Sequence, residues 1–172
     1  MPDDRAQPKG KIMAITLGQR SLSRLDGVHP DLIRVVKRAA TIATADEDFT
    51  VLEGVRSKEQ MCINFGKGRT AAQCEAKGVP GKYAQPGEAK VTWLSNPFLS
   101  NHRRMADGFG RAVDLAPFPV DWNNLGRFDR LANLMFRAAS IEGVAIRWGA
   151  DWDGDGKPRE RGESDSPHFE LA

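Results

Sequence analysis

Two histidines lie in segments that also contain carboxylates able to share a metal ion with them. His102 precedes Asp114, and His168 lies near the end of the chain, three residues after Asp165. Two imidazoles and one carboxylate are a common ligand set for catalytic zinc, because three protein ligands leave the fourth tetrahedral position for water. An aspartate placed like Asp165 is suited to act as a general base toward that water.

The surroundings of two of these residues favour a role beyond an ordinary surface position. Asp114 lies inside the apolar segment 111–116, where an unpaired carboxylate is costly to bury. His168 likewise lies in a short apolar segment at the end of the chain. The residue types alone still leave open both a metal site and separate surface or capping roles.

Several short apolar or β-branched segments predict the sheet that must position these side chains. Strands are expected over 49–55, 91–94, 111–116 and 144–149, with a last strand carrying His168. Helical spacing of apolar residues predicts three helices, from Pro30 to Ala43 with His29 as a cap or surface residue at its start, from near Ser57 through Ile63, and after Asn124 to a stop at Gly143. The glycine-rich residues 66–90 predict mostly loop. This order predicts a single compact α+β domain, with helices packed on a mostly antiparallel sheet that carries the zinc site.

Composition narrows the class of protein. A chain of 172 residues with 40% hydrophobic residues suits one domain with a real core, and we expect a monomer. Because 25 Lys and Arg balance 23 Asp and Glu, with no basic stripe interleaved with aromatic residues, we expect no nucleic-acid partner. No apolar run approaches the roughly 20 residues of a membrane span, so no membrane insertion is expected. The charged start of the chain has no apolar segment behind it and therefore predicts no secretory signal.

The polar residues 1–15 predict a flexible lead-in, followed by a catalytic domain over 16–172. The only cysteines, Cys62 and Cys74, lack the spacing of a zinc knuckle or a redox pair. Two unpaired thiols are favoured over a disulfide bridge.

Several motifs, taken in order, resemble one family. The sequence contains Ser100-x-His102, Gly110-x-Ala112-x-Asp114 and Asp165-x-x-His168, with an upstream arginine motif at 53–60 and a tryptophan segment at 148–152. This pattern resembles the zinc peptidases of the D-alanyl-D-alanine carboxypeptidase and L-alanyl-D-glutamate endopeptidase family, many of whose short members are phage endolysins. The resemblance covers roughly residues 20–172, and several motifs in order are far more specific than any one of them.

The resemblance implies a role for each matching residue. Zinc would be held by His102, Asp114 and His168. Asp165 would take a proton from the attacking water and later return it to the leaving amine. Arg56 would bind the scissile carbonyl oxygen, and Ser100 would bind substrate or orient a ligand.

One departure from the family motif lies between two of the implied ligands. The usual Ser-x-His-x-x-Gly-x-Ala-x-Asp is shorter than the segment here, in which Arg104–Gly108 are extra. We expect this glycine-containing insertion to loop outward without moving His102 or Asp114. Asp107, within the insertion, is a competing carboxylate that a polar loop would leave without a fixed direction.

The loop after the tryptophan segment is acidic. Asp151, Asp153 and Asp155 followed by glycine match the first half of an EF-hand calcium loop, but position 12 is Gly162 instead of a glutamate. A solvated acidic turn is therefore favoured, with a calcium site as the alternative. If calcium binds, the loop is close enough in sequence to Asp165 to order the catalytic segment.

The resemblance implies a zinc endopeptidase that hydrolyses stem peptides of bacterial peptidoglycan at the L-alanyl-D-glutamate bond, as a phage endolysin does. A D,D-carboxypeptidase or D,D-dipeptidase on the same zinc site is the nearest alternative. A wall-binding module with a purely structural zinc is a second alternative to the endopeptidase. For an endolysin we expect synthesis in the host cytoplasm and action on the cell wall in the periplasm after holin-type release.

Overall fold

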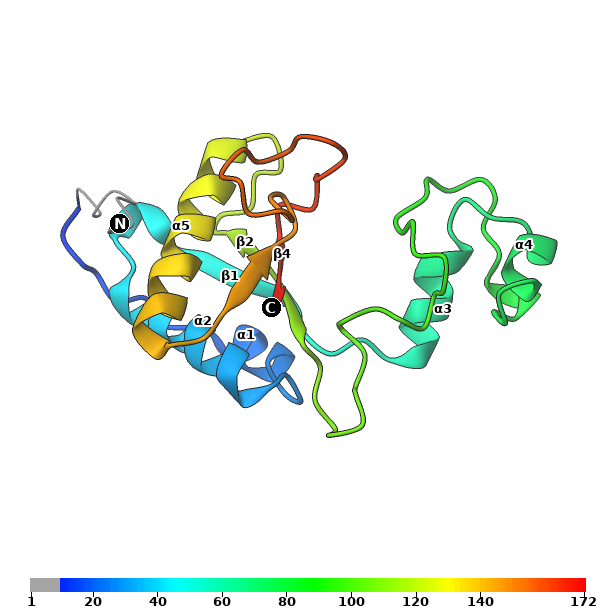
Figure 1. Cartoon of the computed structure of the whole chain (residues 1–172), viewed down its shortest axis with the longest axis horizontal. Coiled ribbons are helices and arrows are strands. Elements are labelled where there is room, and N and C mark those ends of the chain that lie inside the picture. Colours follow the sequence, from blue (N-terminus) through cyan, green and yellow to red (C-terminus); the bar gives the residue numbers. More distant parts are fainter. Residues whose placement is uncertain (1–9) are drawn as a thin grey trace.

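The sheet has four antiparallel strands in the spatial order β1-β2-β4-β3. These strands are β1 (Phe49–Glu53), β2 (Ala112–Pro117), β3 (Ile146–Trp148) and β4 (His168–Leu171). The computed structural model describes residues 10–172, and Figure 1 shows the short C-terminal strand β4 lying between β2 and β3. The end of the chain thus lies near the middle of the sheet, beside the strand that contains Asp114.

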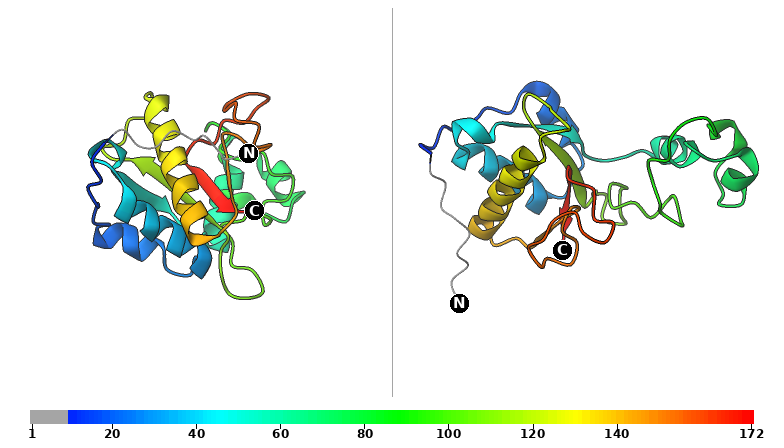
Figure 2. Two further views of the ribbon diagram at one scale, coloured as in Figure 1. Left: turned by 60° about the vertical axis from the view of Figure 1, so that its left-hand side comes forward. Right: turned by 90° about the horizontal axis from the view of Figure 1, so that it is seen from above.

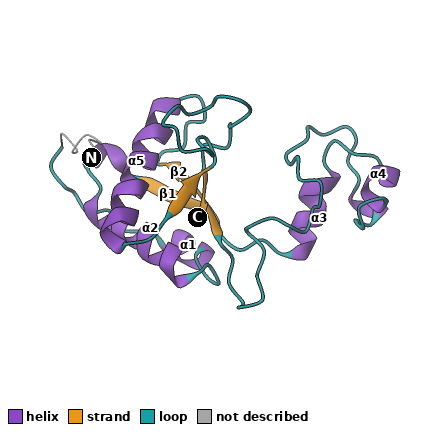
Figure 3. Cartoon of the chain, in the orientation of Figure 1, coloured by secondary structure: helices purple, strands orange, loops and turns teal. Residues whose placement is uncertain are grey.

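Two long helices supply most of the hydrophobic core. Helices α2 (Pro30–Ile42) and α5 (Leu125–Glu142) pack against each other and against one face of the sheet, and α1 (Gln19–Arg24) packs beside β1 (Figure 2). The core between them is fully buried and mostly aliphatic, with Leu32, Val36, Val51, Leu115, Leu134, Met135 and Phe169 among its members. Figure 3 shows that these helices lie on one side of the sheet, which leaves the opposite side for the site. The prediction of a single α+β domain is confirmed.

The ends of the two long helices follow local rules. The ring of His29 accepts a hydrogen bond from the backbone N–H of Asp31, and Pro30 occupies the first helical turn, where a missing N–H costs nothing. Helix α5 ends at Gly143, whose φ of 66° is in the left-handed region that glycine adopts without strain. The predicted cap at His29 and the predicted stop at Gly143 are both confirmed.

A second, smaller lobe projects from the sheet (Figure 1). This lobe, residues 58–98, contains α3 (Lys58–Gly66), α4 (Ala71–Glu75) and the short 3₁₀ turn η2 (Gly81–Tyr83). It has its own small core of Cys62, Phe65, Cys74 and Val79, against which Tyr83 and Phe98 pack. Both cysteines are buried free thiols, and burial raises the pKa of each. The rest of 66–90 is irregular, as the glycine content indicated.

One strand prediction is wrong. Residues 91–94 form no strand and lie in an irregular part of the lobe. The side chain of Trp93 is 78% exposed, so the apolar residues here do not face a buried surface. A β-branched segment becomes a strand only where another strand pairs with its backbone, and local composition does not reveal that partner.

The predicted lead-in, residues 1–15, falls largely on residues 1–9, which lie outside the described part of the chain. From residue 10 onward, the segment runs along the end of α2, where Met13 N–H donates to the carbonyl of Ala43 at 2.8 Å. The short 3₁₀ turn η1 (Ala45–Glu47) then leads into β1. None of the helices described is both long and apolar enough to cross a membrane.

Candidate metal centre

Strand pairing brings two of the three predicted ligands together. In the antiparallel register of β2 and β4, Asp114 lies directly opposite His168. His102 comes from the turn before β2, and its Nε2 lies 3.3 Å from Asp114 Oδ1 and 3.2 Å from His168 Nδ1. Because His168 Nδ1 is 3.2 Å from the same carboxylate oxygen, the three donor atoms form a nearly equilateral triangle. The three predicted residues therefore make a buried group that could hold a metal ion.

The outer nitrogen of each imidazole has a partner that fixes the position of its proton. His102 Nδ1 lies 2.7 Å from the carbonyl oxygen of Gly54, which can only accept, so this nitrogen carries the proton. His168 Nε2 lies 3.0 Å from Glu170 Oε2 and donates to that carboxylate. In the neutral tautomers, the lone pairs of His102 Nε2 and His168 Nδ1 therefore face Asp114. Three lone pairs pointing at one place without a donor are suited to a cation.

Gly54 is required by close packing. A Cβ atom at this position would lie 1.9 Å from the backbone oxygen of Arg24, so no larger residue fits there. The glycine ends β1 and places its carbonyl against His102, while the backbone N–H of Arg56 donates to the His102 carbonyl at 2.8 Å. The segment after β1 thus holds both the ring and the backbone of His102.

The charges of the site shift several pKa values. Burial alone would raise the pKa of Asp114, but the favourable interaction of its carboxylate with the imidazoles of His102 and His168 outweighs burial and holds that pKa far below its usual range. Burial would lower the pKa of His168, but its hydrogen bonds to Asp114 and Glu170 raise it to about 9. The site thus keeps Asp114 anionic and strongly favours a positive charge between the donors.

Glu170 was missed by the sequence analysis. Its carboxylate is 3% exposed, accepts from His168 Nε2 and from Asn101 Nδ2 at 2.7 Å, and pairs with Arg147 at 3.1 Å. Burial raises its pKa, but the hydrogen bonds from His168 and Asn101 outweigh that effect and lower it. The signal that predicts this residue is alternation along a strand, because positions 168 and 170 face the same side of β4.

Arg56 and Ser100 lie beside the ligands. Two nitrogens of Arg56 donate to Glu53 at 2.7 and 2.8 Å, and its Nη2 lies 4.0 Å from Asp114 Oδ2. The hydroxyl of Ser100 accepts from the backbone N–H of His102 at 3.2 Å and from Arg56 Nη1 at 3.4 Å. Ser100 thus helps to fix the turn that carries His102, and Arg56 is fixed beside Asp114.

Asp165 lies at the start of the turn that leads into His168. Gly149 N–H donates to the His168 carbonyl at 2.8 Å, and a Cβ on Gly149 would clash with Asp165 and His168. The Trp148 indole N–H donates to the carbonyl of Ser166 at 2.7 Å and so holds the same turn. Partial removal from water raises the pKa of Asp165, and the nearby charge of Asp114 acts in the same direction. A carboxyl with a raised pKa beside a metal-binding group is suited to accept and return a proton.

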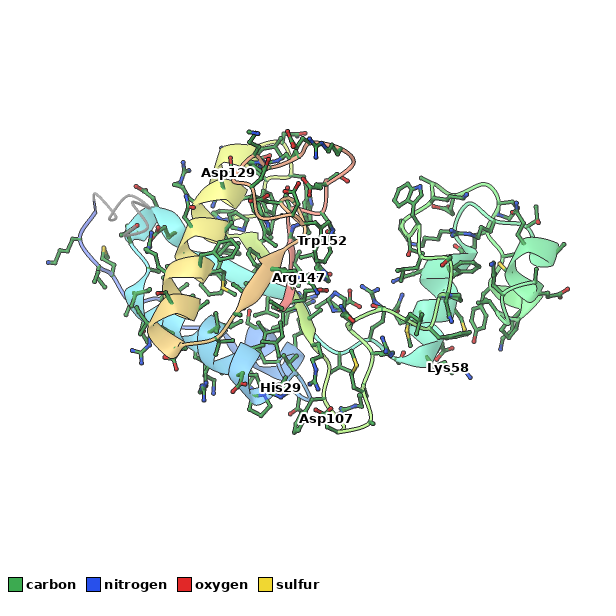
Figure 4. The ribbon with its side chains drawn as sticks, viewed as in Figure 1. His29, Lys58, Asp107, Asp129, Arg147 and Trp152 are labelled. Carbon is green, nitrogen blue, oxygen red and sulfur yellow. The ribbon has the colours of Figure 1, made fainter. Side chains whose placement is uncertain are left out.

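The insertion leaves both ligands in place. Residues 105–109 close a turn in which Met105 N–H donates to the Phe109 carbonyl at 3.0 Å, and Figure 4 shows Asp107 at the tip of the outward loop. The carboxylate of Asp107 accepts from Arg111 at 2.8 Å and from the Phe109 N–H at 3.1 Å. Asp107 therefore has a fixed direction after all, but it faces Arg111 and not the His102 ring.

The acidic loop brings its three aspartates together. Carboxylate oxygens of Asp151, Asp153 and Asp155 lie within 4.8 Å of one another. Glu163, one position beyond the EF-hand spacing, folds back and accepts from the backbone N–H of Trp152 at 2.9 Å. One carboxylate oxygen of Asp151 and one of Glu163 are buried without a hydrogen-bond partner. The ring of Trp152 contacts that of His168, with 5.7 Å between the ring centres, so the loop touches the metal-binding group.

Comparisons with known proteins agree with one another. The family model described as phage L-alanyl-D-glutamate peptidase matches residues 13–172. The L-alanyl-D-glutamate peptidase of Escherichia phage T5 is 28% identical over 165 residues, which cover 92% of this chain and 99% of the relative. The crystal structure of the Serratia marcescens L-Ala D-Glu endopeptidase ChiX superposes with a TM-score of 0.54 at 25% identity, covering 92% of this chain and 91% of that one.

The contact between Glu170 and His168 generates a prediction about metal affinity. Replacement Glu170→Gln keeps the shape of the side chain but removes the charge that makes His168 more basic. We expect the dissociation constant for Zn²⁺ to rise roughly 10- to 100-fold, the usual effect of losing such a partner. Competition with a chromophoric chelator measures it. Glu142→Gln, on α5, is the matched control, and an unchanged affinity in Glu170→Gln would contradict the role assigned to Glu170.

Proposed function

We propose, because the chain belongs to the phage L-alanyl-D-glutamate peptidase family, that it is an endolysin that hydrolyses the L-alanyl-D-glutamate bond of peptidoglycan stem peptides. The family match spans residues 13–172 and thus includes the whole metal-binding group. This is the observation that carries the proposal. The catalytic domain is residues 16–172.

Zinc is the metal that the donor set favours. Zinc bonds to imidazole nitrogen and carboxylate oxygen are about 2.0–2.2 Å long, so ideal tetrahedral angles put two such ligands about 3.3–3.6 Å apart. The three donor atoms here lie 3.2–3.3 Å apart. Two neutral imidazoles and one carboxylate leave a coordination position free, as catalytic zinc sites do. His102, Asp114 and His168 would therefore hold zinc.

Zinc would supply Lewis acidity there, by lowering the pKa of water toward about 7 and polarising the peptide carbonyl. The guanidinium of Arg56, held by Glu53, donates to the carbonyl oxygen of the scissile bond as negative charge develops on it. The hydroxyl of Ser100 accepts hydrogen bonds from both the His102 backbone and the Arg56 side chain, and so holds the two at a fixed position relative to each other. Because Arg56 is fixed before substrate binds, little reorganisation is needed during the reaction.

Asp165 moves the proton. Its carboxylate accepts a proton from the attacking water as the oxygen of that water bonds to the carbonyl carbon. When the carbon–nitrogen bond breaks, the same proton passes from the Asp165 carboxyl to the amine nitrogen that leaves. The raised pKa of Asp165 suits this transfer, because burial makes its carboxylate a stronger base toward the water, while its carboxyl form still gives the proton to the more basic amine.

The alternatives use the same residues differently. A D,D-carboxypeptidase would release only terminal D-alanine, and the relatives found are named for the L-alanyl-D-glutamate bond. A wall-binding module with structural zinc has no use for a carboxyl such as Asp165 beside an open coordination position.

All the proposed catalytic residues come from one chain, so we propose a monomer. We further propose that the enzyme, made in the host cytoplasm, reaches the periplasmic wall through a holin-type pore.

We also propose that the acidic loop binds calcium, the alternative left open by the sequence. The unpaired oxygens of Asp151 and Glu163 support it. So does Glu160, whose pKa is raised by burial and by the surrounding carboxylates. Glu163 supplies the acidic side chain that the EF-hand pattern places at position 12, where this chain has Gly162. Calcium must outcompete two cations, Lys157 Nζ at 3.2 Å from Asp155 and Arg161 Nη1 at 3.9 Å from Asp153. Through Trp152, an ordered loop would support the His168 ring.

The bond that is cleaved is tested by digestion of purified peptidoglycan with the zinc-loaded enzyme. We expect new amino termini on D-glutamate and new carboxyl termini on L-alanine, identified by mass spectrometry and end-group labelling. A heat-inactivated enzyme is the control. Release of terminal D-alanine alone would overturn the assignment.

The role of Asp165 is tested by Asp165→Asn, which keeps the shape of the side chain and its backbone hydrogen bonds. We expect kcat to fall by roughly 10²- to 10⁴-fold, since general base catalysis contributes about that much. Zinc content and melting temperature should stay close to those of the wild type. Asp107→Asn is the matched control, and we expect it to keep full activity. An Asp165→Asn enzyme that still lyses cells would refute the assigned base.

Calcium binding is tested by thermal unfolding of the zinc-loaded protein in increasing CaCl₂. Binding to the native state alone stabilises it, so we expect a rise in Tm of several degrees when calcium far exceeds its dissociation constant. The double variant Asp153→Asn, Asp155→Asn should lose the rise. MgCl₂ is the ionic control. A Tm that does not respond to calcium would show that the loop is a solvated turn.

A further inference from the structure

A cavity of about 680 Å³ opens beside the metal-binding group, between the sheet domain and the projecting lobe. Its lining comes from the β1–α3 segment, from the end of α1, from the lobe and from the turn after His102. Arg56 lines the cavity and also lies 4.0 Å from Asp114. A peptide whose scissile bond lies at the metal-binding group can therefore extend directly into this cavity.

The cavity carries an excess of positive charge. Lys58, Arg103 and Arg104 line it, and within residues 10–172 none of them has a carboxylate partner at ion-pair distance. Arg56 also lines it but is neutralised by Glu53. Asp26 is the single carboxylate in the lining.

These side chains are held in place without losing their charge. Arg103 donates to the carbonyl of Ser100 at 3.0 Å, and Arg104 donates to the carbonyl of Gly108 at 2.8 Å. Gly27 makes room for Arg104, because a Cβ there would lie 2.6 Å from its guanidinium nitrogens. Lys58 Nζ lies 5.3 Å from the ring centre of Phe98. Each arginine uses one donor on a backbone oxygen and keeps others for an anion.

The substrate of the proposed function carries an anion at the matching place. A glutamate on the amine side of the scissile bond has two carboxyl groups, and only one of them continues the peptide. The other remains as a free carboxylate, or as a neutral amide where it has been amidated. It belongs to the residue next to the bond that breaks, so it enters the region beyond Arg56.

We propose that Lys58, Arg103 and Arg104 form a subsite for this free carboxylate and make the enzyme selective for the unamidated stem peptide. The inference rests on the proposed function and deepens it. Guanidinium groups bind carboxylates through paired, charge-assisted hydrogen bonds, whereas a carboxamide offers one neutral acceptor. Arg104 begins the five-residue insertion Arg104–Gly108, so the extra segment contributes to selectivity rather than to metal binding.

The test compares two synthetic peptides that differ only in this group, the free carboxylate of D-glutamate and its carboxamide. For the wild type we expect kcat/KM to be about tenfold or more higher for the acid, mainly through KM, in line with the loss of one charge-assisted hydrogen bond. In Arg104→Gln and in Lys58→Gln, kcat/KM should fall for the acid and stay nearly constant for the amide. Preference for the acid should persist at 0.5 M NaCl, where long-range steering is screened.

Arg130→Gln is the matched control, because it removes an exposed arginine of α5 outside the cavity lining. It should retain the preference of the wild type. Equal cleavage of acid and amide by the wild type, or an unchanged preference in both Arg104→Gln and Lys58→Gln, overturns the subsite alone. A wild-type enzyme that cleaves neither peptide between alanine and glutamate overturns the proposed function and the subsite with it.

Discussion

The register between β2 and β4 is the constraint on which the site depends. It places Asp114 opposite His168, and the alternation of strand residues then places Glu170 behind the His168 ring while Val113 and Phe169 enter the core. A shift of one residue would reverse every side chain and bury the carboxylates among Leu115 and Met135. The hydrophobic core therefore specifies the register, and the register specifies the metal-binding group.

The sequence predicts the parts of the site that break a local pattern. Asp114 and His168 are recognisable because each interrupts an apolar strand, and the predicted strands around them are confirmed. Glu170 also interrupts an apolar strand, but the sequence does not single it out, because its role depends on its contact with the His168 ring. The sequence does not predict the role of Gly54. That role depends on its backbone carbonyl, which faces the His102 ring, and on the close packing of Arg24 at the end of α1.

The lobe shows why fold prediction fails where contacts are few and nonperiodic. Its core joins Cys62 and Phe65 of α3 to Cys74, Val79 and Phe98 across glycine-rich turns. No helical or alternating spacing links these residues, so the sequence predicts the helix near Ser57 and mostly loop over 66–90, but not the small core that joins them. The strand predicted at 91–94 fails for another reason, because β-branched composition does not reveal whether a second strand pairs with the segment. The lobe nevertheless bounds the cavity beside Arg56, so it shapes the side of the site to which we assign the proposed selectivity for the free carboxylate of the substrate.

The charge balance of the site explains why the metal-binding group and the cavity differ in their ligands. Four carboxylates surround the imidazoles, namely Glu53, Asp114, Asp165 and Glu170, and two guanidinium groups, Arg56 and Arg147, compensate two of them. The proposed divalent cation would balance the remaining two negative charges, which are partly removed from water. The cavity beyond Arg56 has the opposite excess, with three cations and one carboxylate. In the proposed mechanism, a negative centre beside a positive pocket would draw the metal ion to the first and the anionic peptide to the second, and this separation would orient the substrate across the site.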